Sequence, residues 1–183
     1  MSKITAISGR VLYNSRGSKT IEVDVVSDEK FVGRVCAPSG ASVGKFEAVS
    51  FPNNSPEESL SILNQNSDKF IGIDVSDLKQ VHDVIHSIDE TENYAKIGGA
   101  CAFAVTIAAT ESAAKAENKQ FFQMISDKND LKFPFPLGNI LGGGAHAGPG
   151  TPDIQEILVA SIGAKTVRES IDMNLQVHKE LKN

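Results

Sequence analysis

Residues 21–25, with the sequence IEVDV, alternate apolar and acidic side chains, and this pattern constrains the fold of the N-terminal region more than any other. A two-residue period is typical of a strand that buries one face. The β-rich stretches 4–13 and 31–37 flank it, and the turn-prone residues 14–19 and 27–30 separate the three. The first forty residues therefore predict an antiparallel meander of three strands.

Helical patterns follow the strands. Residues 55–58, SPEE, form a helix start, with Ser as N-cap, Pro at the first helical position and Glu three residues after the cap. A second start at Ser76 precedes apolar residues at helical spacing as far as Ile88. The alanine-rich residues 99–115 predict a closely packed, mostly buried helix, and residues 121–126 a short one. Strands followed by helices predict an α+β fold, with the helices on one face of the sheet.

A change in composition marks a boundary after these helices. Residues 127–136 are polar and end with two prolines, a pattern typical of a link between domains. We therefore expect one domain at residues 1–130 and a second at 131–183. In the second, residues 137–141 and 154–160 predict strands and residues 165–182 an amphipathic helix. Two strands and a helix cannot bury a core alone, so the second domain looks unfinished.

Composition excludes several classes of protein. The net charge of −5, with 22% charged and 40% hydrophobic residues, is ordinary for a globular protein and argues against a nucleic-acid surface. Residues 98–109, the longest weakly polar run, are too short to span a bilayer. The N-terminus lacks the apolar core of a signal peptide. We expect a cytoplasmic protein that binds neither nucleic acid nor membrane.

Neither the cysteines nor the helical histidines have the spacing of a metal site. Cys36 and Cys101 are far apart and each lies in an apolar run, which predicts buried free thiols. His82 and His86 lie four residues apart, but the Glu of a zinc-binding H-E-x-x-H motif is missing. Solvated helix faces explain these histidines better than zinc.

Residues 38–45, PSGASVGK, resemble a phosphate-binding loop without matching it. The motif G-x-x-x-x-G-K-[ST] requires Gly where Ser39 stands and Ser or Thr where Phe46 stands. Two interpretations remain open. One is a flexible surface loop. The other is a mobile lid in which two glycines act as hinges and the hydroxyls of Ser39 and Ser42 meet a ligand or a hard cation.

Residues 142–156 combine five glycines, a histidine and an acid-amide pair. A lone histidine is often structural, but small neighbours leave His146 exposed and able to meet an anion or transfer a proton. Gln155 and Glu156 are expected in a strand, where successive side chains point to opposite faces, so one of them must face inward. Inside a closed parallel barrel, Glu156 would be an acid-base candidate; at a strand end it would be a solvated carboxylate.

Taken together, the motifs NSRGSKTIEVDV, PSGASVGKFEA, IGGACA, PFPLGNILGGGAHAG and PDIQEILVA closely resemble the enolase family of phosphopyruvate hydratases, most of all its archaeal branch. The resemblance implies an N-terminal α+β capping domain, here the three-stranded antiparallel meander plus helices, followed by the first strands and helix of an incomplete α/β barrel. It also implies Mg²⁺-dependent dehydration of 2-phospho-D-glycerate to phosphoenolpyruvate in glycolysis.

By the same resemblance, the loop at residues 38–45 is the family's lid. Ser42 matches the lid serine that ligates the second Mg²⁺, and Gly40 and Ala41 belong to the same substrate-binding loop. Val43 stands where many members have threonine.

The glycine-rich segment matches the barrel side of the family's site. The resemblance places His146 near the substrate phosphate, Gln155 on the substrate, and Glu156 near the departing hydroxyl. Family members are much longer, and the catalytic lysine and the main carboxylate ligands of Mg²⁺ lie in the part beyond the resemblance. We therefore expect this chain to be inactive alone.

Two other functions remain open. Enolases form dimers or larger homo-oligomers, and the unfinished barrel could instead make this chain a non-catalytic interaction module that completes its barrel with a partner chain. A weaker alternative is a stand-alone phosphate or carboxylate binder that uses the loop at residues 38–45 and His146.

Overall fold

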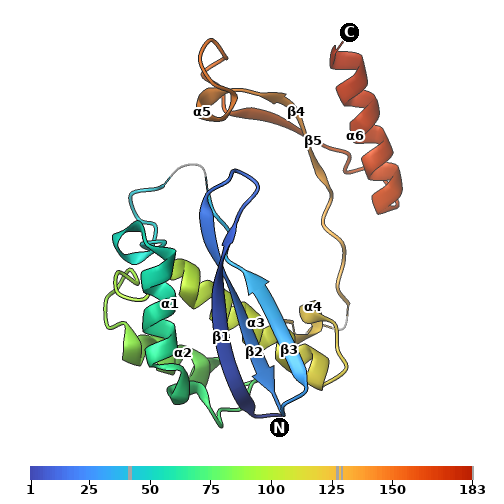
Figure 1. Ribbon diagram of the computed structural model, residues 1–183. Helices are drawn as coiled ribbons and strands as arrows, with labels where there is room; N and C mark the ends of the chain where they lie inside the picture. Colours follow the sequence, from blue (N-terminus) through green and yellow to red (C-terminus); the bar gives the residue numbers. More distant parts are fainter. Residues whose placement is uncertain (41–42, 127, 129, 183) are drawn as a thin grey trace. The chain divides into compact units, whose positions relative to one another are not determined.

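The computed structural model describes residues 1–40, 43–126, 128 and 130–182, except for the side chains of residues 145 and 146 (Figure 1). The chain divides into two compact units, unit 1 at Met1–Asp127 and unit 2 at Lys128–Asn183. No helix in the described part of the chain has both the length and the apolar character needed to cross a bilayer.

Unit 1 contains the predicted meander. Its sheet has the order β1-β2-β3 and consists of β1 Ile4–Tyr13, β2 Lys19–Ser27 and β3 Phe31–Cys36. Both pairs are antiparallel, and the two-residue period of β2 places Ile21, Val23 and Val25 in the core with no exposed surface. The predicted α+β fold is confirmed.

The helices of unit 1 cover one face of this sheet (Figure 1). They are η1 Pro52–Asn54, α1 Pro56–Gln65, η2 Ser67–Phe70, α2 Leu78–Ile88, α3 Gly99–Ala116 and α4 Phe121–Met124. The alanine-rich α3 lies directly on β2 and β3. Its approach is close because β3 has no side chain at Gly33: a Cβ there would lie 1.8 Å from the carbonyl oxygen of Ala108.

Local hydrogen bonds explain where these helices begin. As predicted, Ser55 caps α1, since its hydroxyl accepts the amide of Glu58 at 3.1 Å. The cap of α2 is Asp77 rather than the predicted Ser76. The hydroxyl of Ser76 instead donates to the carboxylate of Asp74 at 2.8 Å, which holds Ser76 in the turn before the helix.

Cys101 is buried as predicted, whereas Cys36 is exposed and differs from the prediction. Cys101 is buried in α3, and burial raises the pKa of its thiol to about 12. Cys36 is exposed, because it pairs with Glu22 on the outward face of the sheet. That face is polar: the guanidinium of Arg34 bonds both carboxylate oxygens of Asp24 at 2.7 Å and thereby lowers the pKa of Asp24.

Unit 2 is an open two-stranded sheet with two helices. Its elements are β4 Leu137–Gly142, α5 Gly144–Ala147, β5 Glu156–Ala160 and α6 Val167–Lys182. The two strands pair antiparallel, and they form no closed barrel, so the acid-base role considered for Glu156 inside a barrel stays a prediction. The buried groups include a polar pair, in which the hydroxyl of Ser161 donates to Asn174 at 2.7 Å and the amide of Asn174 donates to the carbonyl of Pro136 at 2.9 Å.

Candidate functional site

The glycine-rich loop of unit 2 forms one side of a cavity of about 270 Å³. The cavity is lined by Asn139, Gly142, Gly143, Ala147, Gln155 and Glu156. The amide of Gly143 donates to the carbonyl of Gln155 at 2.8 Å, and the amide of Gly144 donates to that of Pro152 at 2.7 Å. A Cβ on Gly143 would lie 2.3 Å from the carbonyl oxygen of Ile154, so only glycine permits this close return of the loop.

Glu156 is the first residue of β5, and its carboxylate is held from the facing strand. Asn139 in β4 donates its side-chain amide to Oε2 of Glu156 at 3.0 Å. Asn139 was not predicted from the sequence as a site residue. The signal that could have identified it is a polar residue inside the otherwise apolar strand LGNILG. The cavity thus combines a carboxylate, an amide that orients it, and residue Gln155.

The expectation that either Gln155 or Glu156 faces the inside of a barrel stays a prediction, because the described residues form no closed barrel. Both side chains are exposed, because β5 begins only at Glu156 and leaves Gln155 in the preceding loop. Among the described residues of unit 2, no second layer covers this end of the sheet. The two residues nevertheless line the same cavity.

His146 lies in α5, the single helical turn within the loop. Its backbone neighbour Ala147 lines the cavity, whereas the side chain of His146 itself lies outside the described atoms. Its proposed contact with a phosphate therefore stays a prediction.

The residues that the resemblance assigns to a lid belong to unit 1. Gly40 is exposed and lines a second cavity of about 580 Å³ between the β1–β2 turn and the start of α1. One wall of this cavity carries the ion pair of Lys19 and Glu57, with Nζ and Oε1 2.5 Å apart. That contact raises the pKa of Lys19 and lowers the pKa of Glu57. Ala41 and Ser42 lie outside the described residues, so their proposed roles stay predictions.

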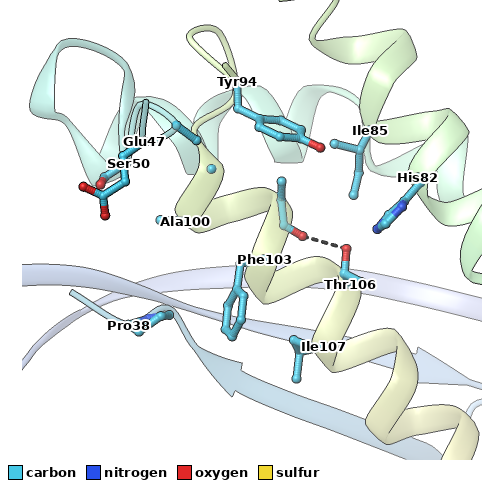
Figure 2. Close-up of a pocket in the computed structure, with 13 residues that line it drawn as sticks. Pro38, Glu47, Ser50, His82, Ile85, Tyr94, Ala100, Phe103, Thr106 and Ile107 are labelled. Carbon is cyan, nitrogen blue, oxygen red and sulfur yellow. Dashed lines mark hydrogen bonds between the residues drawn. The ribbon is translucent and has the colours of Figure 1, made fainter. Parts of the chain in front are cut away.

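A third cavity, of about 420 Å³, lies in unit 1 between α2, α3 and the segment that joins them (Figure 2). Its floor is mainly apolar, and the hydroxyl of Thr106 is already bonded to the carbonyl of Ala102 at 2.8 Å. His82 lines it, whereas the ring of His86 packs against Tyr94 with centroids 5.6 Å apart. We do not place the candidate site here, because none of the described residues that the sequence selects for the site lines this cavity.

Fold and site together define an α+β unit followed by a smaller unit in which polar residues of two paired strands and the loop between them line one cavity. Residues 4–125 match the family model of the enolase N-terminal domain, and residues 130–183 match that of the enolase C-terminal TIM barrel domain. The chain belongs to the enolase family, a family of lyases.

Curated relatives support this assignment. The chain is 38% identical to the enolases of Methanosphaera stadtmanae and Methanothermobacter thermautotrophicus over 182 residues, which are 99% of this chain and 44% of each relative. It is 39% identical to the enolase of Archaeoglobus fulgidus over 94% of this chain and 42% of that one. The chain thus spans less than half the length of these relatives, and unit 2 is the start of a barrel that its described residues do not close.

Proposed function

We propose that this chain contributes one wall of an enolase site, and that the assembled site dehydrates 2-phospho-D-glycerate to phosphoenolpyruvate. The observation that carries the proposal is the shared cavity of Gln155 and Glu156 on the glycine-rich loop, in the unit that matches the barrel model. This geometry supports substrate contact by two adjacent side chains that reach one reacting centre.

Within this proposal each residue has a distinct role. Glu156 lies near the departing hydroxyl and, in its acid form, donates a proton to it so that it leaves as water, while Asn139 fixes the orientation of the carboxyl group through the 3.0 Å hydrogen bond. Gln155 donates a hydrogen bond to the substrate. His146 contacts the phosphate, and Gly40, Ala41 and Ser42 belong to the lid.

The family's Mg²⁺ ions are not accommodated by the described residues alone. No group of three or more His, Cys, Asp or Glu side chains in the described part of the chain could hold a metal ion. Mg²⁺ usually binds through carboxylates, waters and substrate phosphates in octahedral geometry. The described residues therefore do not fit a primary Mg²⁺ site, and the roles above use no step through the ion. Ser42 stays the one proposed metal ligand of this chain.

Replacing Glu156 tests the proposal. We expect a chimera in which residues 1–183 replace the matched part of the Methanosphaera stadtmanae enolase to form phosphoenolpyruvate, detected by ultraviolet absorbance. In this chimera Glu156→Gln should lower kcat by about 10²- to 10⁴-fold with little change in KM, because the proton transfer is lost.

Glu180→Gln, on the exposed side of α6, is the matched control and should leave kcat unchanged. A chimera that folds and keeps its kcat after Glu156→Gln would refute the role of Glu156. The unmodified 183-residue chain should show no turnover with Mg²⁺ and 2-phosphoglycerate, and turnover at ordinary enzyme rates would contradict that expectation.

A second candidate is an interaction module that completes its barrel with a partner chain. The exposure of large apolar side chains on unit 2 favours it: Leu137 is 66% exposed, Leu175 61% and Leu141 47%. We expect the purified chain to self-associate, which size-exclusion chromatography with light scattering would detect as a mass above that of the monomer. Alternatively, the chain should bind a dye that fluoresces on exposed apolar surface. A monomer without dye binding would argue against this module. A homo-oligomer in the cytoplasm remains our prediction for the assembled enzyme.

A further inference from the structure

The segment between α5 and β5 carries a half-buried threonine, Thr151, to which the roles above assign nothing. Its backbone is stiff, because Pro152 follows it and a residue before a proline is confined to extended conformations. Its side chain is stiff as well, since a β-branched residue has few rotamers. The hydroxyl of Thr151 therefore points in a well-defined direction.

The helical turn α5 needs support from outside. It is four residues long, and a helix this short is unstable alone. Its start is held by the segment that returns to β5: the amides of Gly143 and Gly144 donate to the carbonyls of Gln155 and Pro152 at 2.8 and 2.7 Å. These two backbone bonds fix the start of the turn but not its end.

Thr151 holds the end of the turn. Its hydroxyl donates to the carbonyl of Gly148 at 2.7 Å, and the carbonyl of Gly144 lies 3.3 Å from the same hydroxyl oxygen. The bond to Gly148 is the stronger one, because it is shorter. Gly144 and Gly148 stand two residues before and two residues after His146. One side chain thus links both ends of the turn that carries the histidine.

This turn borders the cavity of the candidate site. Ala147, at the end of α5, lines the cavity together with Gln155 and Glu156. The position of the backbone of His146 relative to those two residues therefore depends on how firmly the turn is held. Small shifts matter in such a site, since a misplacement of about 1 Å can slow a reaction by about 10²-fold.

We propose that Thr151 is a positioning residue for the substrate phosphate. Its hydroxyl, by donating to the carbonyl of Gly148, holds the turn of His146 in place beside Gln155 and Glu156. This role rests on the proposed contact of His146 with the phosphate. Thr151 acts through the backbone of the turn and does not itself touch the substrate.

Thr151→Val tests the hydrogen bond in the ¹⁵N-labelled chain of 183 residues. Valine keeps the shape and the β-branch of threonine but removes the donor, and the exposed carbonyl of Gly148 can turn to solvent without loss of the fold. We expect the amide signals of residues 144–148 to shift and those of α6 to stay in place. Thr151→Ser keeps the hydroxyl and should leave the signals of residues 144–148 near their wild-type positions. Unchanged signals there in Thr151→Val would overturn the proposal.

A double-mutant cycle in the chimera described above tests whether Thr151 acts through His146. We expect Thr151→Val to raise KM for 2-phosphoglycerate by about 5- to 10-fold, which is the effect of one lost hydrogen bond, and Thr151→Ser to restore the wild-type KM. In the presence of His146→Ala, Thr151→Val should change KM by less than about twofold, because the residue that it positions is gone. Thr166→Val is the control: it removes a hydroxyl that accepts the amide of Glu169 at 3.1 Å at the start of α6, and KM should stay unchanged.

The outcomes distinguish this role from the proposed function. If His146→Ala raises KM but Thr151→Val does not, the positioning role is overturned and the contact of His146 with the phosphate stands. An equal effect of Thr151→Val with and without His146 would also overturn the positioning role. If His146→Ala leaves KM unchanged, the proposed contact with the phosphate fails, and the role of Thr151 fails with it.

Discussion

Gly33→Ala should destabilise unit 1 by about 3 kcal/mol or more, although it adds a single methyl group. The new Cβ would lie 1.8 Å from the carbonyl oxygen of Ala108 and 2.6 Å from the amide nitrogen of Ser112. Both atoms belong to the backbone of α3, which cannot turn aside as a flexible side chain can. The helix would have to move off β3, and the core beneath α3 would lose its packing.

Urea unfolding followed by circular dichroism at 222 nm measures this loss, because α3 is the longest helix of unit 1. Gly44→Ala is the matched control in the same unit: its nearest contact would be Oε2 of Glu47 at 3.5 Å, an ordinary van der Waals distance. We expect the control to unfold within about 0.5 kcal/mol of wild type. Equal midpoints for Gly33→Ala and wild type would show that α3 does not pack on β3 as described.

The sequence predicted the elements of unit 1 because their signals are local. The alternation in β2 and the cap at Ser55 each depend on a few neighbouring residues, and both are confirmed. Such local signals do not predict which segments that are distant in the sequence will contact each other. The composition of α3 predicted close packing, but nothing near Gly33 indicates that Ala108 lies above it.

In the candidate site too, the residues could be predicted from the sequence but their contacts with distant residues could not. Family resemblance selected Gln155 and Glu156, and the structure brings both to one cavity. Asn139 was missed because its contact with Glu156 depends on the register of β4 against β5, with its irregularity after Asn139. Which of the two side chains faces inward stays a prediction for a related reason: alternation fixes a side chain's face only inside a strand, and Gln155 precedes β5.

Asp89→Ala should have the second large effect, a loss of about 3–5 kcal/mol of unfolding free energy in unit 1. Asp89 has no exposed surface and ends α2. Its carboxylate accepts the amides of Thr91, Lys96 and Ile97 at 3.0, 2.8 and 2.7 Å, and the hydroxyl of Thr91 at 2.6 Å. Alanine would leave three amides without their acceptor in the segment that leads into α3.

The same carboxylate should make unit 1 sensitive to acid. Burial acts to raise the pKa of Asp89, but the hydrogen bonds from Thr91, Ile97 and Lys96 outweigh it, so its pKa lies below the usual value. A carboxyl with a lower pKa in the folded state stabilises the fold above its unfolded pKa, near 4, and this contribution disappears as the pH falls through the folded pKa.

Urea unfolding at pH 7, 5 and 3 checks both effects of Asp89. Wild type should lose more stability between pH 5 and pH 3 than Asp89→Ala, which has no carboxylate left to protonate there. Asp83→Asn is the control, since Asp83 is exposed on α2 and pairs with Lys79 at 2.6 Å, a surface contact that contributes less than about 1 kcal/mol. If Asp89→Ala and wild type lost equal stability in acid, the folded pKa of Asp89 would not be lowered, and the four hydrogen bonds could not be what holds its buried charge.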